Sequence, residues 1–462
     1  MERRAGNASK YRFAARYAGT GFVGAFFLAW SCAATAQSLS GFSGFNDRVK
    51  TVSGSASVFT GVTHTRTDRG ASTDTNTEPS VGVSGQVGGT LESGANALAL
   101  RYGGTLETRR DTAGGDQTDS SSLTGTSRYT HSDPGSRLDF NLGHTVSSVR
   151  NDTGFVVNPS SYDTRNTLSA GAGLRFYPGE LSTLRFFGQA GRSFGEDSLN
   201  DQESYTVGSE FSRRLSERST ASLNVSRSWS DANDVDTTTD SAQLVYSLGL
   251  ESGSFSIGAG GSKAETEVTG GTTSESDAVT GFVERAWVTT DWRTSIKYDR
   301  SLSDSATDLS LNLPPELSFL PDTVRLRDLV VSDSLLITHN NQRVCDVCDL
   351  GLFAEGAILE SQISGATTHE YRAGVNLGFQ LTSLQRLSVG YSWQGDAGED
   401  ANVIVDQIHR FITAWTRQLA ENTTFGVQFN QSYLRSRQIR DDQDQFELRL
   451  VLTQGFAMSG QR

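Results

Sequence analysis

The stretch FELRLVLTQGF, residues 446–456, decides the fold, because apolar and polar side chains alternate along it. Successive side chains of a β-strand point to opposite faces, so this segment predicts a strand with one apolar and one mostly polar face. Similar segments recur from Ser57 onward, and none of them grows into a long apolar run. Repetition of this pattern about twenty times predicts a transmembrane β-barrel, whose strands each need only about ten residues.

The N-terminal residues have the features of a secretory signal peptide. Basic residues precede an apolar stretch at 18–30, and Ala34-Thr35-Ala36 offers a cleavage site. The apolar stretch is shorter than the roughly 20 residues that a membrane-spanning helix needs. The expected organisation is a signal peptide at 1–36, a short periplasmic segment at 37–55, the barrel at 56–456 and a tail at 457–462.

Hydrophobic residues make up only 35% of the chain, although it contains 24 Phe and 48 Gly. A soluble protein of this length normally carries more apolar residues, and a disordered chain would lack the regular alternation. A barrel resolves the conflict, because its interior is polar and only every second strand residue has to be apolar. The net charge of −13 argues against a nucleic-acid partner.

Short turns and long polar segments alternate between the predicted strands. The turns include 132–135, 177–180, 251–254 and 420–422, and the polar segments include 67–77, 107–121, 265–277 and 394–404. This rhythm predicts an all-β, antiparallel up-and-down barrel with short periplasmic turns and long extracellular loops. About nineteen strands follow from the alternation, and bacterial barrels have even numbers of strands. We therefore expect one more strand at 330–338 and about 20 strands in total, with about 18 as the alternative.

The same alternation separates a lipid-facing side from a lumen-facing side on each predicted strand. Leu184 and Phe186, for example, share one face, whereas Arg185 and Gln189 share the other. Charged side chains on the inner face would select solutes by charge and by the width of the passage. The predicted lumen-facing residues are Arg175, Arg185, Gln189, Gln243, Arg293, Lys297, Asp299, Glu447 and Arg449.

Cys345 and Cys348 form the cysteine pair that remains after the predicted signal peptide. In an oxidising periplasm such a pair can close into a disulfide that holds a turn, and this is the interpretation we favour. A thiol-redox pair or half of a metal site are the alternatives. No second C-x-x-C and no nearby histidine pair completes a zinc site.

The segment 303–350 is a central insertion that contains the C-x-x-C, and it holds Pro314, Pro315 and Pro321. Three interpretations of its first part, 303–329, stay open. It could be a constriction loop folded into the lumen, an external loop that binds a partner, or a strand extension capped by a turn. Nothing in its sequence names a ligand.

Sequence motifs for catalysis are missing from the chain. The histidines are scattered, and neither a G-x-S-x-G elbow nor a Walker-type loop occurs. We therefore predict no catalytic residue, no metal site and no cofactor. An outer-membrane enzyme built from residues that converge only in three dimensions ranks third among the functions, and His131 and His144 are where it would first be sought.

Several stretches resemble one family of barrels. The segment RNTLSAGAGLRF at 165–176 leads to LRFFG at 184–188, and EFSRRLSERS at 210–219 is followed by SRSWSD at 226–231. They are similar to the outer-membrane barrels associated with exopolysaccharide and PEP-CTERM gene systems of Proteobacteria. The resemblance covers roughly residues 50–300 and is generic in its motifs, because hairpin chemistry alone can generate them. It implies a link to polysaccharide export or the cell envelope and supplies no catalytic residue.

The sequence thus predicts a protein of the cell outer membrane. We expect a porin-like channel for a polar or charged solute, or a barrel component of envelope polysaccharide export. A scaffold barrel with a plugged lumen is the alternative. The expected partners are outer-membrane lipid and lipopolysaccharide, the barrel-assembly machinery and, for export, polysaccharide or export-system proteins.

Overall fold

A computed structural model provides the structure of the chain. It describes residues 49–69, 72–111, 117–133, 135–150, 162–195, 201–232, 235–268, 273–303, 308–310, 323–325, 329–362, 365–398, 403–436 and 441–459. The predicted signal peptide at 1–36 lies outside the described residues and stays a prediction. Within the described ranges, no helix is long and apolar enough to cross a membrane.

The described chain folds into one closed antiparallel sheet of 20 strands, together with a separate two-stranded sheet. This confirms the predicted all-β up-and-down barrel and its strand number. The strands of the barrel are β1 (Val49–Arg69), β2 (Ser72–Ser93), β3 (Asn96–Arg110), β4 (Gln117–Ser132), β5 (Leu138–Arg150), β6 (Tyr162–Gly179), β7 (Ser182–Gly195), β8 (Gln202–Arg214), β9 (Ser219–Ala232), β10 (Val235–Leu250), β11 (Gly253–Val268), β12 (Thr273–Val288), β13 (Trp292–Ser303), β16 (Val330–Cys345), β17 (Cys348–Ser361), β18 (Thr367–Thr382), β19 (Gln385–Ala397), β20 (Ile404–Ala420), β21 (Thr423–Ser436) and β22 (Asp441–Ser459).

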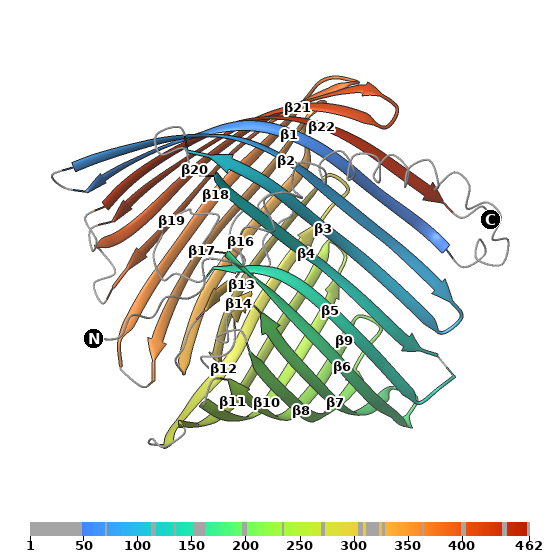
Figure 1. Ribbon diagram of the computed structural model, residues 1–462. Coiled ribbons are helices and arrows are strands. Elements are labelled where there is room, and N and C mark those ends of the chain that lie inside the picture. The colour runs from blue at the N-terminus through green and yellow to red at the C-terminus, as the bar shows by residue number, and fades with distance from the viewer. Residues whose placement is uncertain are drawn as a thin grey trace, which may run out of the picture.

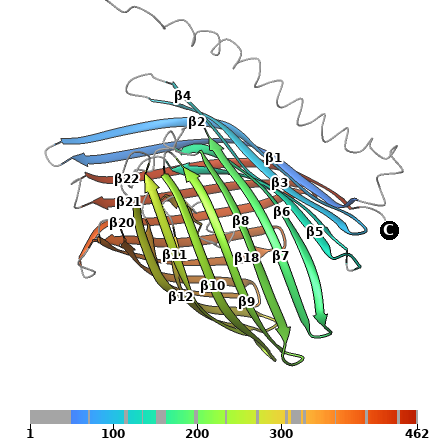
Figure 2. The same cartoon turned by 90° about the horizontal axis from the view of Figure 1, so that it is seen from below.

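Pairing between the first and last strands closes the sheet. β1 pairs with β22 in an unbroken register from Thr51 opposite Ser459 to Arg69 opposite Asp441. On its other side β1 pairs with β2. Figure 1 shows the result, with the blue N-terminal strands beside the red C-terminal strand, and Figure 2 shows the same ring of strands turned by 90°. A closed sheet leaves no edge strand with unpaired backbone groups.

Both ends of the barrel sequence and the short turns lie at the same end of the barrel, which we call the short-turn end. The predicted turn at 251–254 joins β10 to β11 there. The predicted strand at 330–338 is confirmed as part of β16, which pairs with β13 and β17. The second half of the predicted insertion 303–350 therefore belongs to the barrel wall, because its backbone pairs with β13 on one side and with β17 on the other.

Within the insertion the structure describes two short strands between β13 and β16, and we call this pair the hairpin β14–β15. Its strands are β14 (Asp308–Ser310) and β15 (Thr323–Arg325), which pair with each other and not with the barrel sheet. β15 contacts β5. Because β5 is almost half-way round the 20-strand order from β13 and β16, the hairpin reaches across the barrel to its opposite side.

The strands are longer than the alternation alone predicts. β1 begins at Val49 and β22 ends at Ser459, so the predicted barrel bounds 56–456 are corrected at both ends. Small polar residues there break the apolar pattern, yet they still pair across the β1–β22 seam. Parts of the predicted loops 67–77 and 265–277 also continue as paired strands. These segments are rich in Thr, whose branched side chain suits a pleated sheet.

The two walls of the barrel have opposite chemistry. On β22, Leu448 and Leu450 are 44% and 41% exposed. On the inner faces of the neighbouring strands β1 and β2, Thr63 and Ser80 are only 2% and 5% exposed. Apolar side chains that are exposed while polar ones are buried reverse the arrangement of a water-soluble protein. The outer wall is therefore built to face hydrocarbon.

Charged pairs on the outer wall mark where the strands leave that apolar zone. Arg227 and Asp240 lie opposite each other on β9 and β10 and are joined by hydrogen bonds of 2.6 and 2.5 Å. Asp240 lies in turn opposite Lys263, which forms an ion pair with Glu275. Paired charges are costly in hydrocarbon. The ends of these strands away from the short turns therefore stand in water.

Gly253 opens β11 in a conformation that other residues rarely adopt. Its φ is 131°, and a Cβ there would overlap the carbonyl oxygen of Ala286. We expect Gly253→Ala to lower the free energy of unfolding by about 1–3 kcal/mol. Heat-dependent mobility of the refolded protein on gels would measure the change. Gly179→Ala is the matched control, because a Cβ at Gly179 meets nothing within 4 Å; equal effects of both substitutions would contradict this account.

Candidate functional site

The inner wall is the candidate functional surface, and contacts that skip strands identify it. Arg449 on β22 reaches Glu107 on β3, with Nη2 3.4 Å from Oε1, although β1 and β2 lie between them. Neighbouring strands are about 4.8 Å apart, so these two backbones are about 14 Å apart along the sheet. Side chains converge over that separation only on the concave face. Arg449 and Glu107 therefore face the lumen.

Four charged side chains meet at this position, and we call them the Glu107 cluster: Glu107, Arg109, Glu447 and Arg449. Arg449 Nη2 lies 2.6 Å from Glu447 Oε1, and Arg109 Nε lies 3.2 Å from Glu107 Oε1. The Arg449 guanidinium also stacks 4.4 Å from the centre of the Phe59 ring. Two acids and two bases compensate each other here, so the cluster fills part of the wall without leaving a net charge.

A second group, the Asp139 cluster, consists of Asp139, Arg175 and Arg185 on β5, β6 and β7. Arg185 Nη2 lies 2.7 Å from Asp139 Oδ1, and Arg175 Nε lies 3.0 Å from Oδ2. Gly173 lies between the charged side chains. A Cβ there would be 2.7 Å from Arg185 Nε and 2.8 Å from Asp139 Oδ1. Glycine at this position therefore leaves the space that the ion pair occupies.

The registers place the predicted lumen-facing residues on the same wall. Arg175 and Arg185 lie opposite each other and share Asp139. Glu447 and Arg449 belong to the Glu107 cluster. Lys297 Nζ lies 3.2 Å from Asp299 Oδ1. The other predicted residues lie elsewhere round the wall: Gln189 opposite Gly171, Gln243 opposite Gly260, and Arg293 opposite Asn340.

The inner wall also carries charged residues that were not predicted from the sequence. Glu107 and Asp139 lie between apolar residues that face outward. Alternation of inner and outer side chains along a strand could therefore have predicted that they face the lumen. Asp396 lies within the predicted loop 394–404, but the structure places it in β19. Which of these residues meet across strands depends on the register, and alternation within one strand does not reveal a register.

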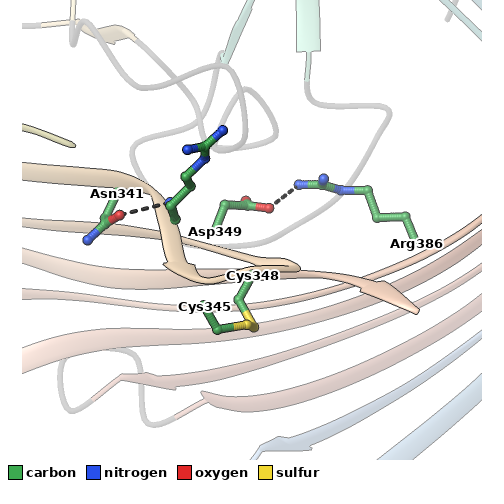
Figure 3. Close-up of a disulfide and its surroundings, with 6 residues drawn as sticks. Asn341, Cys345, Cys348, Asp349 and Arg386 are labelled. Carbon is green, nitrogen blue, oxygen red and sulfur yellow. Dashed lines mark hydrogen bonds and ion pairs between the residues drawn. A yellow bond between two sulfur atoms is a disulfide. The ribbon is translucent and has the colours of Figure 1, made fainter. Parts of the chain in front are cut away.

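A disulfide joins Cys345 and Cys348 at the short-turn end, where β16 turns into β17. Figure 3 shows it beside two polar contacts that hold the same turn. The Arg343 backbone N–H donates to Asn341 Oδ1 at 2.9 Å. Arg386 on β19 donates to Asp349 Oδ1 at 2.6 Å. The bond thus closes a turn of the wall, away from the hairpin β14–β15.

The two histidines named for a possible enzyme both lie on the outer wall. His144 Nδ1 is 2.8 Å from the Tyr102 hydroxyl, and His131 Nδ1 is 2.9 Å from Asn96 Oδ1. Among the residues that the structure describes, no group of three or more His, Cys, Asp or Glu is arranged to hold a metal ion.

The closed sheet, its even strand number, its apolar outer wall and its short turns beside both chain ends are the features of barrels that span the outer membrane. The chain is an outer-membrane β-barrel. The short-turn end then faces the periplasm, and the opposite end faces the outside.

No family model matches the chain, and no curated protein matches it. Similar solved structures are outer-membrane proteins. A mutant of the ferric enterobactin receptor PfeA from Pseudomonas aeruginosa is 11% identical, with 88% of this chain and 80% of that chain covered and a TM-score of 0.48. The FrpB iron transporter of Neisseria meningitidis is 8% identical, with 87% and 81% covered and a TM-score of 0.43. OpdQ of Pseudomonas aeruginosa is 10% identical, with 88% of this chain and 98% of that chain covered and a TM-score of 0.39.

Removing Arg449 should destabilise the barrel, because Glu107 and Glu447 would lose their shared counter-charge. We expect Arg449→Leu to lower the free energy of unfolding by about 1–3 kcal/mol. Denaturant unfolding of the refolded protein, followed by tryptophan fluorescence, would measure it.

The matched control is Arg192→Leu on the outer wall. Arg192 is 65% exposed and lies 3.5 Å from Glu203. An exposed pair of this kind should contribute less than about 1 kcal/mol. A larger loss from Arg192→Leu than from Arg449→Leu would contradict the role assigned to the Glu107 cluster.

Proposed function

We propose that the protein is a porin-like channel through which small polar or charged solutes diffuse across the outer membrane. The observation that supports it is the inner wall, which carries charged side chains from β3, β5, β7, β13 and β22. A barrel of about 20 strands is wide enough to enclose an aqueous passage. Charges that line such a passage select solutes by sign and size.

The hairpin β14–β15 would act as the constriction of this channel. It starts and ends on one side of the barrel, and β15 contacts β5 on the other side. A segment that crosses the opening narrows the passage for any solute. This favours the constriction loop over the external loop and the capped strand extension.

A filled barrel that serves as a scaffold is the second candidate, and one observation favours it. Phe353, Ile408 and Leu434 lie on the inner faces of β17, β20 and β21 and are only 6%, 3% and 4% exposed. An inner wall open to water would leave apolar side chains more exposed. Part of this wall is therefore covered. A role in polysaccharide export, and the partners predicted for it, rest on the sequence resemblance alone.

Conductance of the refolded protein in a planar bilayer separates channel from scaffold. We expect stable single-channel steps that grow at least about twofold when residues 305–327 are replaced by a short Gly-Ser linker, because the passage would lose its constriction. A folded barrel without steps, in both forms, would overturn the channel.

The control for this deletion is the far tip of the β1–β2 hairpin, where Arg66 lies opposite Thr75. Removing residues 67–74 shortens a hairpin that belongs to the wall and does not cross the opening. The conductance should then stay unchanged. An equal increase in both deletions would show that β14–β15 is not a specific constriction.

A further inference from the structure

A third charged group on the inner wall differs from the other two. We call it the Arg372 cluster: Glu355, Glu370, Arg372, Asp396 and Asp406 on β17 to β20. Glu370, Asp396 and Asp406 lie in one row across β18, β19 and β20, because Glu370 is opposite Asp396 and Asp396 is opposite Asp406. Glu355 lies opposite Arg372, one step further along the wall. The cluster lies near the end of these strands that is away from the short turns and faces the outside of the cell.

Arg372 is buried in the middle of this group. Its side chain is 7% exposed, with Nη2 3.1 Å from Glu370 Oε2 and Nη1 3.8 Å from Glu355 Oε2. Its Nε and Nη1 have no hydrogen-bond acceptor, so two of its three nitrogens lack one. A buried guanidinium normally satisfies its donors, since leaving them unpaired costs about 1–3 kcal/mol or more.

Two carboxylates of the cluster also have an oxygen that is buried and without a donor: Oδ1 of Asp396 and Oδ1 of Asp406. Both residues lie on the inner face and are half-buried as a whole, although these two oxygens are buried. Unpaired donors of Arg372 and unpaired carboxylate acceptors thus occur side by side, whereas in the Glu107 cluster Arg449 Nε is the one buried atom without a partner, and the Asp139 cluster has none.

The charges of the cluster do not balance. Arg410 lies on the same face of β20 and has an interaction of its own. Even with Arg410 counted, four carboxylates face two guanidinium groups. In the Glu107 cluster two acids face two bases, and in the Asp139 cluster Asp139 and Glu210, which lies opposite Arg185 on β8, face two bases. The Arg372 cluster is the acidic place among these three.

We propose that the Arg372 cluster binds a small solute in which an ammonium group stands beside a hydroxyl or carboxylate oxygen, as in an amino sugar or an amino acid. The ammonium group donates to Asp396 and Asp406 and supplies the missing positive charge. The neighbouring oxygen accepts from Arg372. No arrangement that could hold a metal ion occurs in the described chain, which favours an organic cation. This inference rests on the proposed channel and names the class of solute that it would take.

Glucosamine and N-acetylglucosamine are the probes, because N-acetylation removes the positive charge of the amine and leaves the sugar ring unchanged. Binding is measured by titration calorimetry on the refolded full-length barrel in detergent. We expect glucosamine to bind at least about tenfold more tightly than N-acetylglucosamine, a difference of about 1.4 kcal/mol. Asp396→Asn with Asp406→Asn should remove that preference. Equal binding of the two sugars, or an unchanged preference in the variant, would overturn the site.

The control variant is Glu180→Gln with Glu421→Gln, which removes the same number of charges from exposed turns. It should bind glucosamine like the unchanged protein, and a matching loss would overturn the site by showing an effect of net charge. Heat-dependent gel mobility verifies folding, and Asp406→Asn alone replaces the double variant if that does not fold.

Glucosamine binding without conductance would overturn the channel and leave the site standing. Conductance without the preference would overturn the site and leave the channel.

Discussion

Pairing of β1 with β22 is the interaction on which the rest of the structure depends. Backbone N–H and C=O groups find no water in hydrocarbon, so a sheet can span a membrane only when its two edges pair with each other. The seam between β1 and β22 does this along its whole length, from Thr51 and Ser459 to Arg69 and Asp441. Closure also creates an inside and an outside, and the proposed functions depend on the side chains of the inside.

The inner wall shows how a barrel of this width can carry many charges. Long Arg side chains lie along the wall and reach acids on strands that are not neighbours, as Arg449 reaches Glu107. Glycine leaves the space for such contacts, as Gly173 does beside Arg185 and Asp139. Paired charges stabilise the wall, whereas the adjoining unpaired donors and acceptors of the Arg372 cluster form the proposed ligand site. Arginine and acidic side chains therefore have two roles on the inner wall: they pair with each other to stabilise it, and we propose that in the Arg372 cluster they bind a solute.

Much of the fold was predictable, because alternation within a strand is a local signal. Alternation placed Arg185, Glu447 and Arg449 on the polar face, and the even strand number of bacterial barrels predicted the further strand at 330–338. Alternation missed the strand ends near Val49 and Ser459, where small polar residues pair without an apolar pattern. The candidate site was harder to predict from the sequence. Asp396 stood in a predicted loop, and its neighbours Glu370 and Asp406 come from other strands, so only the registers bring them together.

Cross-linking across the seam tests the closed barrel most directly. Ser57 and Thr453 lie opposite each other on β1 and β22, with hydroxyl oxygens 2.8 Å apart. In a Cys345→Ser/Cys348→Ser background, Ser57→Cys with Thr453→Cys should form a disulfide in the folded protein on mild oxidation. Ser57→Cys with Gly455→Cys should not, since Gly455 lies opposite Ser55. A cross-link in the second pair alone, or in neither, would contradict the register and with it the closed wall on which the account rests.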